Sequence, residues 1–136
     1  MEEESYLIFR DGKHFFQKFI KKNFGHITIL KKDKFNWFRV EPYNDRILFE
    51  ILPFASDNDA PLQNYLKEVH GGVLRIRQKI ITRDYYSLSC FHFMNCVSVC
   101  KYILGIKNMC CTPYSLYEWL IRNVGEQGIL EIEKLN

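Results

Sequence analysis

The first half of the chain carries short apolar and β-branched runs separated by turn residues, a pattern typical of antiparallel strands. We predict strands over 5–10, 25–31, 37–42, 46–52 and 73–81. Hairpin connections at 33–36 and 43–45 join three consecutive runs, which indicates a meander. Two other segments are predicted as irregular structure: a loop over 53–61, and an ordered loop or edge strand over 83–89.

Apolar residues recur at helical spacing in four segments, two of which make up most of the last third of the chain. We predict helices over 13–22, 62–69, 96–104 and 114–123. Thr112 and Pro113 form a good helix start, and Gly105 is a suitable stop for the helix before it. Residues 126–136 are either a final short strand at 129–132 or a frayed tail. The pattern predicts an α+β domain with a central antiparallel sheet.

Length and composition limit the function classes. A chain of 136 residues that is 47% hydrophobic predicts one domain over 1–136, with a tail at 124–136 that packs loosely. The net charge is only +3, and the basic residues are spread along the chain, so a nucleic-acid partner is not favoured. The remaining nucleic-acid hypothesis would use Arg75, Arg77, Lys79 and Arg83.

Targeting signals and cysteine usage point to a reducing compartment. The acidic start differs from a signal peptide, and no apolar run approaches the roughly 18–20 residues of a membrane span. The five cysteines are therefore expected as free thiols rather than a disulfide framework. The series Cys90, His92, Cys96 and Cys100 matches no common zinc spacing, so we predict no metal and no cofactor.

Three residues have the chemistry of a cysteine nucleophile site. Cys96 falls where a helix begins, and unpaired N–H groups there favour a thiolate. His26 shares one face of its strand with Thr28, while Ile27 and Ile29 take the other. Glu41 lies on the next strand, close enough to orient the imidazole if the two strands pair. Taken singly, each residue also fits a structural role: a buried cysteine, a packed histidine and a surface glutamate.

The order His26, Glu41, Cys96 resembles the circularly permuted papain-like cysteine hydrolases of the NlpC type, in which the two strands precede the cysteine helix. The chain also looks like a group of small bacteriophage proteins of this permuted type. The resemblance spans roughly residues 5–121. It rests on Asp11-Gly12-Lys13 before an aromatic pair, Phe24-Gly25-His26, Trp37 to Pro42, Cys96-Val97 with Lys101 and Leu104-Gly105-Ile106, and Thr112-Pro113-Tyr114 with Leu116-Tyr117.

The resemblance implies a thiol-protease-like site on an NlpC-type fold, with the cysteine helix packed on the sheet. Cys96 would be the nucleophile and His26 the general base. Glu41 would orient the histidine, with Asn36 or Asn95 as substitutes, and backbone N–H groups at Cys96 or Val97 would meet the oxyanion. The substrate would be a peptide, protein or acyl compound, attacked through a thioester and released by hydrolysis or acyl transfer.

The same resemblance places the protein in the cytoplasm of a phage-infected bacterium, with the virion as the other location. A second hypothesis comes from a different class: a non-catalytic, phage-encoded interaction protein on the same scaffold that binds a host or virion component. The two hypotheses predict different surroundings for Cys96. A His26 imidazole out of reach of Cys96, or a sealed Cys96, favours binding, and an open cleft over Cys96 favours catalysis.

Overall fold

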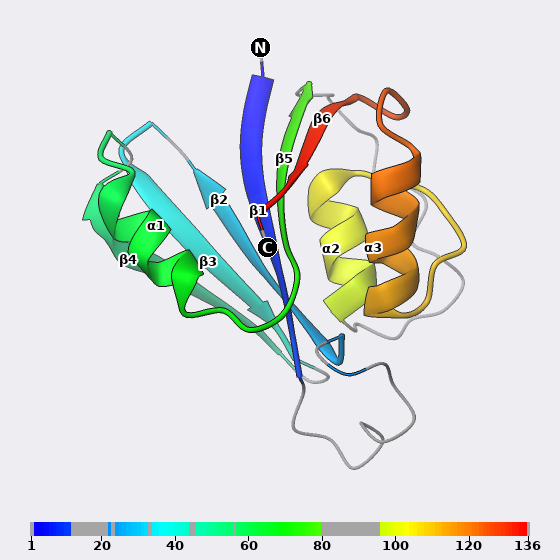
Figure 1. The fold of residues 1–136 in the computed structure, drawn as a ribbon, viewed down its shortest axis with the longest axis horizontal. Coiled ribbons are helices and arrows are strands. Elements are labelled where there is room, and N and C mark those ends of the chain that lie inside the picture. Colours follow the sequence, from blue (N-terminus) through cyan, green and yellow to red (C-terminus); the bar gives the residue numbers. More distant parts are fainter. Residues whose placement is uncertain are drawn as a thin grey trace.

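The computed structural model describes residues 2–11, 22, 24–32, 34–43, 46–55, 57–79 and 96–135. Six strands form one antiparallel sheet (Figure 1): β1 Glu2–Arg10, β2 His26–Lys32, β3 Asn36–Pro42, β4 Ile47–Ala55, β5 Val73–Lys79 and β6 Ile129–Lys134. The order across the sheet is β4-β3-β2-β1-β5-β6, so β1 lies inside the sheet between β2 and β5. The predicted α+β class with a central antiparallel sheet is confirmed.

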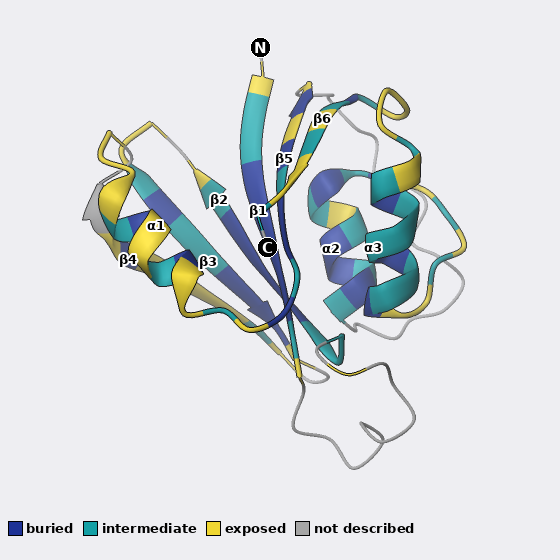
Figure 2. Cartoon of the chain, viewed as in Figure 1, coloured by how far each residue is buried: buried dark blue, intermediate teal, exposed yellow. Residues whose placement is uncertain are grey.

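Three helices in the described ranges pack on the two faces of this sheet: α1 Ala60–Lys67, α2 Cys96–Leu104 and α3 Pro113–Arg122. Side chains alternate between the faces of a strand, so β1 to β5 each supply residues to two cores. The α2 and α3 face is built on Leu7, Phe9, Ile27, Ile29 and Val40, with Leu104 and Leu116 from the helices. The α1 face is built on Tyr6, Ile8, Leu30 and Trp37, with Leu62 and Leu66 from the helix. Figure 2 shows the buried residues between these layers.

Two helix-end signals predicted from the sequence are confirmed, one at the end of α2 and one at the start of α3. Gly105 has φ 59°, and the N–H groups of Gly105 and Ile106 donate to Tyr102 and Lys101. This is a Schellman end for α2, which glycine permits because it lacks a Cβ. Thr112 Oγ1 accepts from the N–H of Ser115 at 3.1 Å and completes a capping box at the start of α3.

The predicted bounds of the loop over 53–61 are wrong, because β4 continues to Ala55 and α1 begins at Ala60, which leaves a shorter connection between them. An edge strand tolerates Pro53 since one side of its backbone has no partner strand, and Pro61 fits the first turn of a helix. The alternatives for the C-terminal segment are settled in favour of a strand, β6.

The predicted helix over 13–22 falls almost wholly outside the described residues, and the segment 83–89 lies outside them entirely. None of the helices that the structure describes is long and apolar enough to cross a membrane.

Candidate active site

Strand register brings His26 and Glu41 to the same end of the sheet. β2 and β3 pair through Ile29 and Val40, so the next residues outward on the two strands are Thr28 and Glu41. His26 is the first residue of β2 and pairs with Arg10, the last residue of β1. The hairpin predicted from residues 33–36 is therefore what joins the histidine and carboxylate strands.

The three candidate catalytic residues lie together at this end of the sheet. His26 Nε2 lies 2.7 Å from Glu41 Oε2. Cys96 lies near the same imidazole, because its side chain is one of the groups that raise the pKa of His26. Cys96 is the first residue of α2, is partly exposed and packs at the margin of the core.

The two partners of His26 favour the charged imidazole. Burial alone lowers the pKa of His26, but the hydrogen bonds to Cys96 and Glu41 and their negative charge outweigh it and raise the pKa from 6.5 to about 9. His26 is therefore an imidazolium at neutral pH.

Glu41 is held by a second layer of donors. Its side chain is only 7% exposed. Oε1 accepts from Arg10 Nη2 and from Thr28 Oγ1, both at 2.8 Å, which leaves Oε2 for His26. Burial raises the pKa of Glu41, but the hydrogen bonds from His26 and Thr28 and the charge of Arg10 lower it overall. A carboxylate with donors on both oxygens keeps a fixed orientation toward the imidazole.

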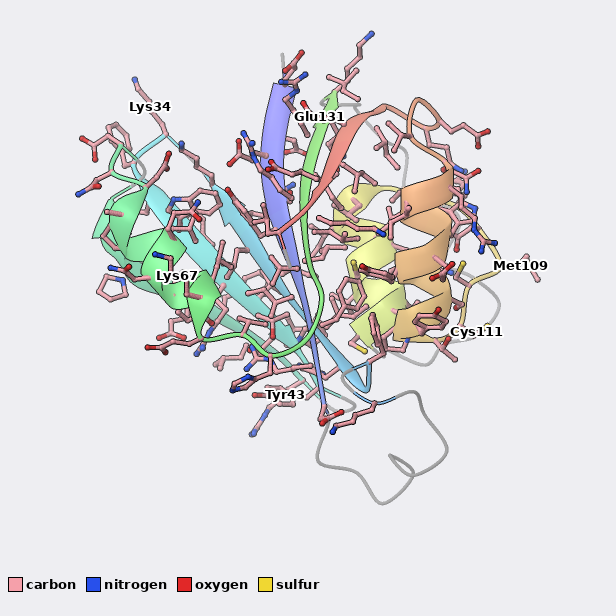
Figure 3. The ribbon with its side chains drawn as sticks, viewed as in Figure 1. Lys34, Tyr43, Lys67, Met109, Cys111 and Glu131 are labelled. Carbon is pink, nitrogen blue, oxygen red and sulfur yellow. The ribbon has the colours of Figure 1, made fainter. Side chains whose placement is uncertain are left out.

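An aromatic ring lies against the exposed side of His26. Tyr43 stacks on the imidazole with ring centroids 5.9 Å apart and planes 23° apart. The guanidinium of Arg46 lies over the Tyr43 ring, with its carbon 5.3 Å from the ring centroid. Figure 3 shows Tyr43 at the lower end of the sheet. Tyr43 thus borders the site, whereas Trp37 is fully buried in the α1-side core.

The alternatives for the third residue differ in position. Asn36 begins β3, five residues from Glu41, and so lies roughly 16 Å away along the strand. Asn36 as a substitute for Glu41 is therefore wrong, because it occupies the opposite end of the sheet from His26. Asn95 lies outside the described residues. Val97 is 2% exposed, so its side chain belongs to the core and only its backbone N–H could serve an oxyanion.

Cys100 and Cys111 have different surroundings from Cys96. Cys100 is completely buried, and burial raises the pKa of its thiol so that it stays protonated. Cys111 is exposed on the loop before α3, beside Met109 (Figure 3). Cys90 and His92, which belong to the rejected zinc series, lie outside the described residues. Within the described ranges, no three His, Cys, Asp or Glu side chains group as metal ligands.

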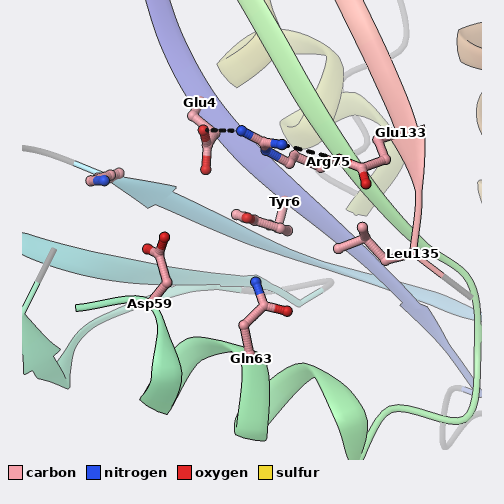
Figure 4. Close-up of a pocket in the computed structure, with 8 residues that line it drawn as sticks. Glu4, Tyr6, Asp59, Gln63, Arg75, Glu133 and Leu135 are labelled. Carbon is pink, nitrogen blue, oxygen red and sulfur yellow. Dashed lines mark hydrogen bonds and ion pairs between the residues drawn. The ribbon is translucent and has the colours of Figure 1, made fainter. Parts of the chain in front are cut away.

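A separate polar cavity of about 260 Å³ lies between α1 and the strands β1, β5 and β6 (Figure 4). Arg75 crosses it and contacts Glu4 and Glu133, each at 3.0 Å. Tyr6 also lines it, and burial together with Glu4 raises the pKa of Tyr6 to about 12. Among the residues that the structure describes, its lining contains no cysteine, histidine or serine, and so none of them is a nucleophile of the kind at Cys96.

Two of the three basic residues of β5 are matched by acids on neighbouring strands. Arg75 contacts Glu4 and Glu133, and Arg77 contacts Glu2 and Glu131. These pairs neutralise much of the positive charge that the nucleic-acid hypothesis requires. Arg83 lies outside the described residues.

Sequence reasoning missed the roles of Arg10 and Thr28. Thr28 was placed on the His26 face, which is the signal that could have identified it as a donor to Glu41. Arg10 could not be placed, because its contact depends on β1 pairing beside β2.

Comparisons of the chain with protein-family models, with curated proteins and with solved structures find no match.

Proposed function

We propose that this protein is a cysteine hydrolase or acyl-transfer enzyme with a permuted papain-like, NlpC-type fold. Cys96 is the nucleophile, His26 the proton carrier and Glu41 the residue that orients His26. The observation that carries the proposal is the grouping of Glu41, His26 and Cys96: the imidazole lies 2.7 Å from the Glu41 carboxylate, and Cys96 is near enough to raise the pKa of His26. These groups come from three elements, and a packed structural cysteine needs neither partner.

The proposed reaction begins with the Cys96 thiolate attacking the carbonyl carbon of an amide, ester or thioester. Backbone N–H groups at the start of α2, at Cys96 and Val97, stabilise the oxyanion. The imidazolium of His26 gives its proton to the leaving group, which departs as the thioester on Cys96 forms. Water activated by neutral His26, or a second acceptor, then cleaves the thioester and restores the thiol.

Two observations support catalysis over the binding hypothesis. Cys96 is near enough to His26 to raise the pKa of the imidazole, and Cys96 is partly exposed rather than sealed in the core. The substrate class that we propose is a peptide, protein or acyl compound. We place the enzyme in the cytoplasm of a phage-infected bacterium or in the virion, on the basis of the bacteriophage-like motifs alone.

The test is the rate of iodoacetamide modification at each cysteine, mapped by mass spectrometry between about pH 5 and pH 9, in the wild type and in His26→Ala. Cys96 should react at least about tenfold faster than Cys111 near pH 6.5, although Cys111 is the more exposed of the two, and His26→Ala should remove that advantage. Cys100 should remain unmodified until the protein unfolds. A Cys96 that reacts identically without His26 would remove the basis for catalysis.

A further inference from the structure

Strand β4 is an open and unusually apolar edge of the sheet. Among the described residues, its one partner strand is β3, and no strand pairs with its outer side. Leu48 is 45% exposed, Phe49 68% and Ile51 63%. Soluble proteins normally protect such edges with short strands, charges or proline, because a long apolar edge pairs readily with another strand. In β4 the proline, Pro53, comes after residues 47–51 and leaves the backbone of that run available, so the exposed side chains there indicate an interface.

The backbone at this edge can be assigned from the hairpin that connects β3 to β4. The N–H of Tyr43 donates to the carbonyl of Arg46 at 2.7 Å, so these two residues form a hydrogen-bonded pair. Such pairs alternate with non-hydrogen-bonded pairs along an antiparallel ladder. Ile47, Phe49 and Ile51 are partnered by Pro42, Val40 and Phe38 and fall at the non-hydrogen-bonded positions. Their N–H and C=O groups therefore point away from β3, toward the open edge.

We propose that a second copy of this chain pairs with β4 in antiparallel fashion about a twofold axis at Phe49. Phe49 then faces Phe49 of the second copy, and Ile47 faces Ile51 of the second copy. All of these residues have outward backbone groups, so the pairing forms roughly six hydrogen bonds, two for each of three pairs. Apolar side chains meet apolar side chains on the same face, as an isologous interface requires.

Charge also favours this register. Glu50 is the charged residue of β4, and Arg39 of β3 already contacts its carboxylate. With the axis at Phe49, each Glu50 faces Leu48 of the second copy, so the two carboxylates are not opposite each other. An axis at Glu50 would set like charges directly across from one another, which destabilises a strand pair.

The exposed area suits a weak dimer. An aromatic side chain buries roughly 150–250 Å², so two Phe49 rings that are 68% exposed present roughly 200–340 Å². Leu48, Ile51 and the strand backbone bring the total toward the roughly 1,000 Å² at the lower end of specific interfaces. We therefore expect dissociation in the micromolar range.

Sedimentation equilibrium between about 1 and 200 µM tests this proposal, because interfaces of this size bind weakly. The wild type should approach twice the monomer mass, and Phe49→Lys should weaken the dimer at least about tenfold. Phe35→Lys is the matched control: Phe35 is 67% exposed but lies outside β4, in the connection between β2 and β3, and should leave dimerisation unchanged. A wild type that stays monomeric would overturn the proposal.

Disulfide cross-linking tests the register. In a Cys111→Ser background, the Phe49→Cys variant should form a disulfide between the two copies at position 49 on mild oxidation, because residues on the twofold axis face each other. Glu50→Cys should self-link much more slowly. A dimer that survives Phe49→Lys, or one in which Glu50→Cys links faster than Phe49→Cys, contradicts pairing about Phe49. None of these outcomes depends on whether Cys96 is catalytic.

Discussion

Raising the pH through about 9 is expected to destabilise the folded chain, because it removes the proton from His26. Burial lowers the pKa of His26, but the bonds to Cys96 and Glu41 raise it from 6.5 in the unfolded chain to about 9 in the folded one. A folded-state pKa above the unfolded value gives stability that is fully present below about pH 6.5. That stability is lost as the pH rises through about 9.

The size of the effect follows from the difference between the two pKa values. Each unit corresponds to 1.36 kcal/mol, so a rise from 6.5 to about 9 represents about 3 kcal/mol of the free energy of unfolding. The His26 side chain is 18% exposed, so solvent screens little of this energy. With an m-value of roughly 1–3 kcal/mol per molar urea, the unfolding midpoint should move by about 1–3 M.

Urea unfolding of the wild type and of His26→Gln, followed by fluorescence of buried Trp37, measures this contribution. Other groups titrate over the same range, so the informative quantity is the difference between the two proteins at each pH. That difference should shrink by about 3 kcal/mol between pH 6 and pH 10, in keeping with a pKa of about 9. A difference that is constant over this range, or that changes near pH 6.5, refutes the argument.

Two further predictions concern Glu41 and α3. Glu41→Gln keeps the shape of the side chain but removes its charge. An NMR titration should therefore show the pKa of His26 falling by at least about one unit. A pKa that stays near 9 contradicts the role of Glu41. Thr112→Ala removes the acceptor for the Ser115 N–H and should cost about 1 kcal/mol of unfolding free energy in urea, whereas Thr112→Ser should retain most of it; equal losses in both variants would exclude the cap as the cause.

The sequence predicts the parts of this fold that depend on neighbours along the chain. The β2–β3 hairpin follows from two apolar runs on either side of residues 33–36. Residues 96–104 have helical periodicity and a glycine after them, and these limits match α2. The predicted loop over 53–61 begins at Pro53, whereas β4 continues through this residue because an edge strand can hold a proline.

Contacts between distant segments could not be predicted in the same way. The place of β1 in the sheet depends on pairing with β2 on one side and β5 on the other, and no short-range pattern encodes that choice. Arg10 reaches Glu41 only through this pairing. The closeness of Cys96 to His26 likewise depends on where α2 docks, which packing decides.

Arg10 changes how the proposed site should work. A carboxylate shared with an arginine stabilises an imidazolium less than a carboxylate that faces the histidine alone, because the positive charge of Arg10 offsets part of its field. The raised pKa of His26 therefore draws on Cys96 as well as on Glu41. Cys96→Ala should consequently lower the pKa of His26 even though the bond to Glu41 remains. An imidazole whose pKa stays near 9 without Cys96 would instead assign the whole effect to Glu41, and the thiol would then be a neighbour of the histidine rather than its charged partner.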